Sequence, residues 1–167
     1  MPDVPATAAP ARSRVEPLPP ATTSEIVGLL EYFDAYDGVD DIFDLAAETD
    51  HEFGHMMAIV KAAEMLNFVD TPKQGVVLTQ EGRRSVKADP EERKAIWRAQ
   101  LLKLRFFQDV YDLLRRETSV TGDIVREMII MAMPREDYET MFDTMVRWAR
   151  FGNLFAYEES ANRLSLQ

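Results

Sequence analysis

The sequence predicts a mainly α-helical protein with small β-hairpins, arranged as two tandem winged-helix-like units. Two observations lead to this class. Capping residues precede a series of helices, and two pairs of short β-prone segments follow them, within residues 68–79 and 154–166. The order helix, helix, helix, hairpin therefore occurs twice, and this order is typical of a winged helix.

The first 21 residues differ in composition from the rest of the chain. They carry six of the nine prolines and show no apolar periodicity. Such a segment cannot bury enough apolar surface to offset the entropy of ordering, so we expect 1–21 to be a disordered Pro/Ala-rich linker. Beyond it we expect a first winged-helix unit over 22–88, and a long helix plus a second winged-helix-like unit over 89–167.

The first unit is expected to contain three helices, a hairpin and one further short helix. A capping box marks its start, and acidic caps precede its second and third helices. A Pro-Lys-Gln-Gly turn between two β-prone segments marks the hairpin. The expected elements are a helix from Thr22 toward Gly38, a helix over 42–46 capped by Asp40 or Asp41, a helix over about 51–66 capped by Asp50, strands at 68–71 and 76–79, and a helix from Thr79 to Val86.

The second unit begins with the strongest helix start in the chain. Asp89 can cap the helix, Pro90 suits its first position, and two glutamates fall in its first turn. A second hairpin is expected at the end of the chain. The expected elements are a long helix from Pro90 to about Arg116, a helix opened by Thr121, a helix begun by Pro134 and ended by Gly152-Asn153, and strands at 154–157 and 163–166.

Apolar residues of the two units correspond at nearly one spacing, which predicts a duplicated winged helix. The spacing is 85 residues within the third helix and 86 in the hairpin. The matched pairs are Phe53 with Tyr138, Met57 with Phe142, Val60 with Met145, Leu66 with Phe151, Phe68 with Leu154, and Leu78 with Leu164.

Composition excludes several classes of function. The chain has no cysteine, so disulfides and thiolate chemistry are excluded and a reducing cytoplasm is the expected compartment. No apolar run approaches the roughly 20 residues of a membrane-spanning helix, and the N-terminus lacks the apolar core of a secretory signal. A net charge of −10 opposes binding to nucleic acid or to an anionic membrane surface.

One motif has the spacing of a metal site. His51-Glu52-Phe53-Gly54-His55 has the form H-E-x-x-H, in which two histidines bind zinc and the glutamate acts as general base. A catalytic zinc needs a third protein ligand, and these are the only two histidines in the chain. The motif also begins at a helix cap, where the first turn frays. We therefore expect two solvated histidines and no metal at His51, Glu52 and His55, with a zinc hydrolase as a remote alternative.

The chain is not expected to be an enzyme or to hold a cofactor. It has no Gly-x-x-x-x-Gly-Lys-Ser/Thr phosphate loop and no Gly-x-Gly-x-x-Gly string. No serine stands in an evident relation to a histidine.

The outward face of the expected helix over 51–66 is the best candidate for an interaction surface. Ala58, Ala62 and Met65 lie on it, and small or apolar side chains on an outward face favour close packing against another protein. A winged-helix DNA-binding regulator is the main alternative. That face offers Lys61 as its one certain cation and lacks the Arg, Asn or Gln side chains that read bases, so no specific nucleic acid is expected as a partner.

From Ser24 onward the chain resembles the C-terminal AAA-associated domain attached to ATPase subunits of nitrate/sulfonate/bicarbonate-type ABC transporters. The order and spacing of the matching segments are specific as a set. They are SEIVGLLEYF, DIFDLAAE, IVKAAEMLNFVDTPKQGVVLTQEGRR, ADPEERKAIWRAQLL and WARFGNLFAYEESANRLSL.

The resemblance implies a noncatalytic regulatory or protein-interaction domain. Its partner would be an ABC ATPase domain or subunit, joined in cis or acting in trans, and its contact with a membrane would be indirect, through the transporter. The family's ATP-binding residues have no counterparts in this chain. The sequence does not specify the transported substrate, an effector, or whether the domain activates or inhibits.

Overall fold

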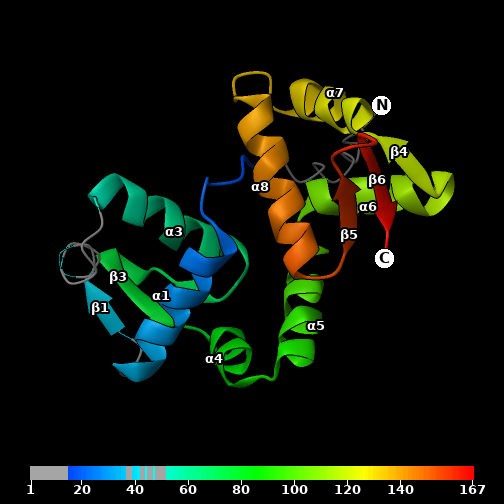
Figure 1. Cartoon of the computed structure of the whole chain (residues 1–167). Coiled ribbons are helices and arrows are strands. Elements are labelled where there is room, and N and C mark those ends of the chain that lie inside the picture. The colour runs from blue at the N-terminus through cyan, green and yellow to red at the C-terminus, as the bar shows by residue number, and fades with distance from the viewer. Residues whose placement is uncertain (1–14, 37–38, 42–43, 45–46, 48–51) are drawn as a thin grey trace, which may run out of the picture.

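The first half of the molecule consists of helices packed on a small antiparallel sheet (Figure 1). The computed structural model describes residues 15–36, 39–41, 44, 47 and 52–167, and all structural statements concern these residues. The elements of this half are α1 (Thr23–Ala35), β1 (Val39–Asp41), α3 (Phe53–Met65), β2 (Val69–Asp70), the 3-10 helix η1 (Pro72–Gln74), β3 (Gly75–Leu78) and α4 (Gln80–Lys87).

The second half repeats this arrangement after one additional helix. The strand order is β1-β3-β2 in the first sheet and β4-β6-β5 in the second, with antiparallel pairing throughout. The elements are α5 (Pro90–Leu101), α6 (Arg105–Glu117), β4 (Ser119–Thr121), α7 (Gly122–Ala132), α8 (Tyr138–Phe151), β5 (Phe155–Glu158) and β6 (Arg163–Leu166).

The expected class, mainly α with small β-hairpins, is confirmed. Both expected hairpins are present, within two residues of their expected bounds. The winged-helix assignment of both units stays a prediction, and in the first unit most of the segment 42–46 lies outside the described residues. The N-cap residue of α3 is Glu52 rather than the expected Asp50. The division of the chain at residue 88 also stays a prediction.

Helix α3 and helix α8 end in the same hydrogen-bonded turn. The N–H groups of Leu66, Asn67 and Phe68 donate to carbonyls of α3, and the same three bonds recur 86 residues later. Asn67 and Asn153 both adopt positive φ, at 61° and 53°, which is the left-handed conformation expected of a helix stop. The repeated bonds are Leu66 to Ala62 and Gly152 to Trp148, Asn67 to Glu64 and Asn153 to Arg150, and Phe68 to Ala63 and Leu154 to Ala149.

Burial supports this spacing of 86 residues along the helices and corrects the expected spacing of 85. Each buried residue of α3 has a buried counterpart in α8 at that distance. Apolar periodicity could not fix the alignment to one residue, because helical apolar positions recur at both three and four residues. The buried pairs are Met56 with Phe142, Ile59 with Met145, Val60 with Val146, Ala62 with Trp148, and Ala63 with Ala149.

The expected long helix from Pro90 to Arg116 is two helices. The chain leaves α5 through a tight turn in which the N–H of Leu104 donates to the carbonyl of Leu101 at 2.9 Å, and the extended Leu104 then begins α6. Because of this break, α5 and α6 point in different directions and pack against different residues (Figure 1). Trp97 of α5 contacts Phe68 and Phe151, and the ring of Phe107 of α6 is stacked with that of Trp148.

Two short strands were not expected. Residues 39–41 form β1 and residues 119–121 form β4, and each pairs with the central strand of its sheet. Thr121 is the N-cap residue of α7, as expected. Two further expectations are wrong. Helix α8 begins at Tyr138 rather than at Pro134, since Asp137 supplies the cap by accepting from the N–H groups of Glu139 and Thr140. The end of the expected linker is ordered, because Leu18 and Ala21 are buried.

Candidate functional site

The segment 15–21, called the strap here, packs between the two halves of the molecule. It was expected to be part of the disordered linker, but Leu18 and Ala21 are each only 3% exposed. The indole N–H of Trp148 donates to the carbonyl of Ala21 at 3.0 Å. Figure 1 shows the strap in blue between α3 and α8. Apolar contacts and a buried hydrogen bond therefore hold a proline-rich segment that composition alone assigns to a linker.

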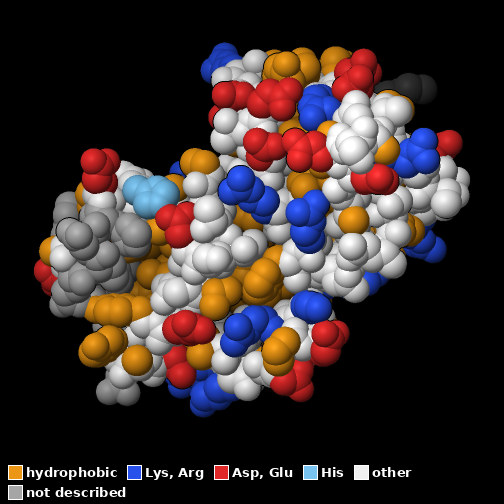
Figure 2. All heavy atoms as spheres, in the orientation of Figure 1, with side chains coloured by type: hydrophobic (Ala, Val, Ile, Leu, Met, Phe, Trp, Pro, Cys, Tyr) orange, Lys and Arg blue, Asp and Glu red, His pale blue; other side chains and the backbone are white. Residues whose placement is uncertain are grey.

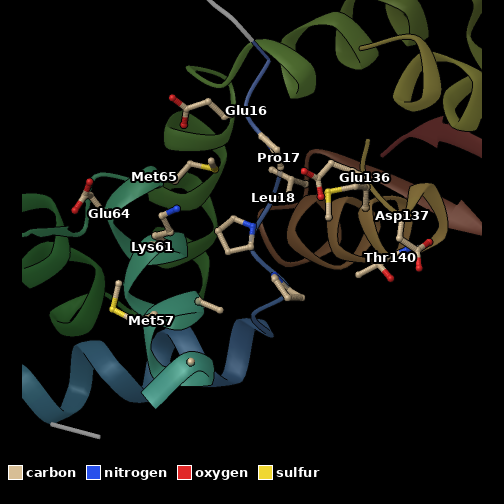
Figure 3. Close-up of a pocket in the computed structure, with 15 residues that line it drawn as sticks. Glu16, Pro17, Leu18, Met57, Lys61, Glu64, Met65, Glu136, Asp137 and Thr140 are labelled. Atoms are coloured by element: carbon tan, nitrogen blue, oxygen red, sulfur yellow. The ribbon is translucent and has the colours of Figure 1, made fainter. Parts of the chain in front are cut away.

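A groove runs beside the strap, between α3 and the start of α8 (Figure 3). We call it the α3–α8 groove; its volume is about 1070 Å³. Its walls come from three parts of the chain far apart in sequence. The lining residues are Glu16–Pro20 of the strap, Gly54, Met57, Ala58, Lys61, Glu64 and Met65 of α3, and Glu136, Asp137, Thr140 and Met141 at the start of α8.

The chemistry of the groove is apolar inside and acidic at its edges. The half-buried Met57 and Met65 supply flexible, polarisable side chains that adapt to different partners, and the buried Met141 lies behind them. Exposed carboxylates of Glu16, Glu64, Glu136 and Asp137 surround them, and Lys61 is the one cation of the lining. In Figure 3 the side chains of Glu16 and Glu64 lie on one side of the strap backbone, and those of Glu136 and Asp137 lie on the other. This combination suits a protein segment better than a small anionic ligand.

The structure separates the three residues predicted to form the interaction surface. Ala58 and Met65 are half-buried and line the groove. Ala62 is fully buried, because the buried arc of α3 extends past the single stripe assumed on a helical wheel. An outside partner cannot touch Ala62 in this conformation. The interaction role of the other two residues stays a prediction.

The H-E-x-x-H motif is only partly described by the structure. His51 lies outside the described residues, and Glu52 is the exposed N-cap residue of α3. The ring Nε2 of His55 contacts the carboxylate of Glu25 on α1. Among the described residues, no group of three His, Cys, Asp or Glu side chains is placed to hold a metal ion.

Glu25 has a second task, because it belongs to the capping box of α1. Its side chain accepts from the N–H of Thr22, and the hydroxyl of Thr22 accepts from the N–H of Glu25 at 3.1 Å. Burial alone would raise the pKa of Glu25, but the bonds from Thr22 and His55 outweigh it, so the pKa lies below the ordinary value of 4.5. The carboxylate thus joins the start of α1 to the first turn of α3.

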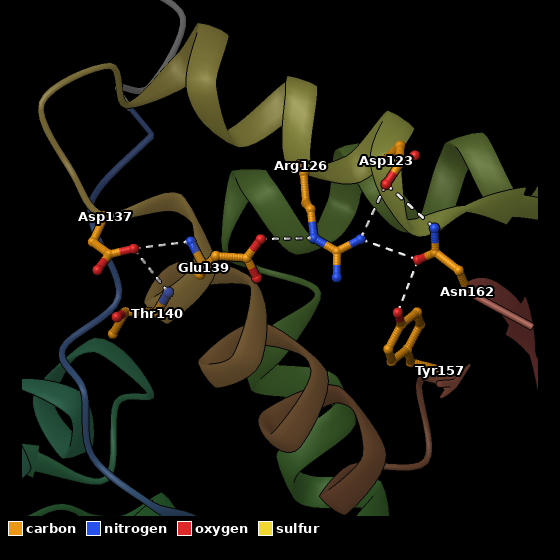
Figure 4. Close-up of polar contacts among 7 residues, drawn as sticks. All are labelled: Asp123, Arg126, Asp137, Glu139, Thr140, Tyr157 and Asn162. Carbon is orange, nitrogen blue, oxygen red and sulfur yellow. Dashed lines mark hydrogen bonds and ion pairs between the residues drawn. The ribbon is translucent and has the colours of Figure 1, made fainter. Parts of the chain in front are cut away.

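A polar cluster that sequence reasoning missed is centred on Arg126 of α7 (Figure 4). Its guanidinium donates to the side-chain oxygen of Asn162 at 3.0 Å and forms an ion pair with Glu139 at 3.3 Å. It also lies 4.1 Å from the ring centre of Phe142. Because Tyr157 and Asp123 bond to Asn162 as well, the cluster joins α7, α8 and the second hairpin.

The Arg126 cluster is a structural device in this arrangement. Burial would lower the pKa of the guanidinium, but Tyr157 and the nearby carboxylates raise it above the ordinary value. The charge is therefore fixed, and an arginine with a fixed charge does not transfer protons. No spacing signal could have revealed the cluster, because its members come from three different elements. Two of its bonded members, Asp123 and Asn162, are 39 residues apart in the chain.

The family model for the C-terminal AAA-associated domain matches residues 43–158. No curated protein and no solved structure matches the chain. In addition, no helix in the described part of the chain combines the length and apolar character that a membrane crossing requires.

Proposed function

This chain belongs to the family of C-terminal AAA-associated domains, and we propose that it is a noncatalytic regulatory domain that binds an ABC transporter ATPase subunit of the nitrate/sulfonate/bicarbonate type. An accessory role beside an ATPase follows from the family. The transporter class rests on the resemblance of the sequence segments. The ATPase would be joined in cis or act in trans, in the cytoplasm, and the domain would reach the membrane only through the transporter.

The α3–α8 groove is the observation that supports a binding role. It presents half-buried Ala58 and Met65 beside adaptable methionines, in a hollow that the chain's own strap fills only partly. Nothing favours DNA as the partner, because Lys61 is the one cation among the residues that line it. The chain also lacks a phosphate loop. Hydrolysis is accordingly assigned to the partner ATPase, and this domain changes its rate.

The test is ATP hydrolysis by the cognate ATPase, identified from its neighbouring coding sequence, with and without the full 167-residue chain. We expect a change in turnover when the domain is joined or added in trans. Ala58→Arg should reduce this change by placing a large cation in the groove. Ala62→Glu is unsuitable as a probe, because a carboxylate at a fully buried position would unfold the domain.

Ala95→Arg is the matched control, because Ala95 is an exposed alanine in α5 outside the groove. It should leave the effect on turnover unchanged. Unaltered turnover together with no detectable binding, in both the joined and the separate format, would refute the regulatory proposal.

A further inference from the structure

The internal repeat allows the surroundings of α8 to be compared with those of α3, beginning with the C-terminal end of α8. Helix α5 immediately precedes α6 and packs on the C-terminal end of α8, where the rings of Trp97 and Phe151 lie 4.5 Å apart. The contact is close. A Cβ added at Gly152 would lie 2.9 Å from a methyl carbon of Leu101 and 3.1 Å from the backbone nitrogen of Arg98. Arg98 also donates to the carbonyl of Asn153 at 3.2 Å.

In the first half, the surface of α3 that corresponds to the end of α8 is covered by the thin strap and not by a helix. The residues of α3 that correspond to Phe151 and Gly152 of α8 are Met65 and Leu66. The strap precedes α1 as α5 precedes α6, and it lies beside α3. However, the strap is an extended chain, whereas a helix with its side chains is about 10 Å wide. Met65 consequently stays half-buried, and the α3–α8 groove remains open next to it.

Charge indicates the kind of helix that fits this groove. Its rim carries the exposed carboxylates of Glu16 and Glu136 on two different walls. Helix α5, which packs on the end of α8 that corresponds to Met65, is amphipathic and carries Arg93, Lys94 and Arg98 beside Glu91 and Glu92. It buries Ile96, Trp97 and Leu101, and its exposed side includes Lys94. An acidic rim around an apolar floor is complementary to a helix that carries Lys and Arg beside an apolar face.

We propose that the α3–α8 groove is the docking site for a basic amphipathic helix of a partner protein. This inference rests on the proposed function, since it specifies which part of an ATPase-side partner the domain holds. The helix lays its apolar face against the half-buried Met57, Ala58 and Met65, and its Lys and Arg side chains face Glu16 and Glu136. A second copy of this chain fits poorly, because two molecules of charge −10 repel each other.

The probe is a fluorescent peptide of about 18 residues, in which Leu and Lys are placed in helical register. Its binding to the full chain is measured by anisotropy at physiological ionic strength, where long-range attraction is screened. We expect saturable binding, and none by a peptide with Glu in place of Lys. Glu16→Lys with Glu136→Lys should weaken binding about tenfold or more, equivalent to about 1.4 kcal/mol, and Ala58→Arg should also weaken it.

The control is Glu31→Lys with Glu117→Lys, which changes the net charge equally at exposed positions outside the groove. If this control weakens binding as much as the groove variant, the attraction is general and the proposal is overturned. Self-association of the chain that Ala58→Arg abolishes would identify a second copy as the occupant and would also overturn it. Altered ATPase turnover without peptide binding at the groove would overturn this assignment alone and leave the regulatory function standing.

Discussion

Two helical glycines differ in the space that their surroundings leave for a side chain. Gly82 lies at the start of α4, and a Cβ there would stand 2.2 Å from the carbonyl oxygen of Phe68 and 2.7 Å from a methyl carbon of Leu78. The backbone oxygen cannot move away easily, because it accepts the N–H of Thr79 at 3.0 Å. Gly28 in α1 has open space around the same position.

Gly82→Ala should therefore lower the free energy of unfolding by about 1–3 kcal/mol, as overpacked sites do. Gly28→Ala should raise it by about 0.5–1 kcal/mol, because alanine is the better helix residue. Denaturant titration of both variants measures the difference. Equal stability of the two variants would mean that α4 does not approach Phe68 as closely as described.

The lowered pKa of Glu25 predicts how stability depends on pH. A carboxyl group whose pKa is lower in the folded state contributes stability fully above its unfolded value, here 4.5, and loses that contribution as the pH falls through the folded value. Because glutamine can still complete a capping box, Glu25→Gln removes mainly the charge, and it should be less stable than wild type at neutral pH by about 0.3–1 kcal/mol, the contribution of a carboxylate in the first turn of a helix. The difference should shrink below pH 4.5.

Thermal unfolding between neutral and acidic pH tests this expectation. Glu31→Gln, on the exposed side of the same helix, is the control and should follow the wild-type curve. A Glu25→Gln deficit that is constant with pH would show that the loss comes from packing rather than from the charge.

At the scale of elements, the strap is the part whose contribution can be isolated. Leu18 is 3% exposed, while Pro17 beside it is exposed. Leu18→Ala should destabilise the protein by about 2–5 kcal/mol, as other buried leucines do, whereas Pro17→Ala should have little effect. Limited proteolysis should cut near residues 15–21 faster in Leu18→Ala only. Wild-type protease resistance in Leu18→Ala would indicate that the backbone bond from Trp148 to Ala21 suffices.

The elements that could be predicted are those with a local chemical signal. Thr22, Thr79 and Asp89 cap helices with the side-chain bonds that their spacing predicts. The interruption between α5 and α6 has no proline or glycine to mark it. The strands β1 and β4 are three residues long and exist through pairing with distant strands, so no local pattern identifies them.

The candidate site was predicted only in part, for a related reason. The sequence identified the helix face that carries Ala58 and Met65. It could not show that the strap and the start of α8 would complete a groove, because these segments are more than 100 residues apart in the chain. The burial of Ala62 likewise depends on packing that a single helical wheel does not contain.

At the scale of the whole molecule, one buried core extends through both halves. Figure 2 shows acidic side chains gathered over the end of the molecule where α7 lies and α8 begins, with basic side chains interspersed among them. Besides the strap, the aromatic contacts of Trp97 link the two halves. Its ring lies 5.5 Å from Phe68 and 4.5 Å from Phe151, and it is fully buried.

This position of Trp97 predicts that the halves unfold together in the wild type and separately when the ring is removed. Hydrogen exchange measures the opening free energy of each hairpin independently, β2–β3 in the first half and β5–β6 in the second. In the wild type both should open with the same free energy. Trp97→Ala should cost about 3–5 kcal/mol and should lower protection of the first hairpin more, because the second retains the Arg126 cluster.

Trp97→Phe is the control, since it keeps a ring between Phe68 and Phe151. Equal loss of protection in both hairpins of Trp97→Ala would show that the repeat behaves as one cooperative unit, held together by the strap rather than by α5.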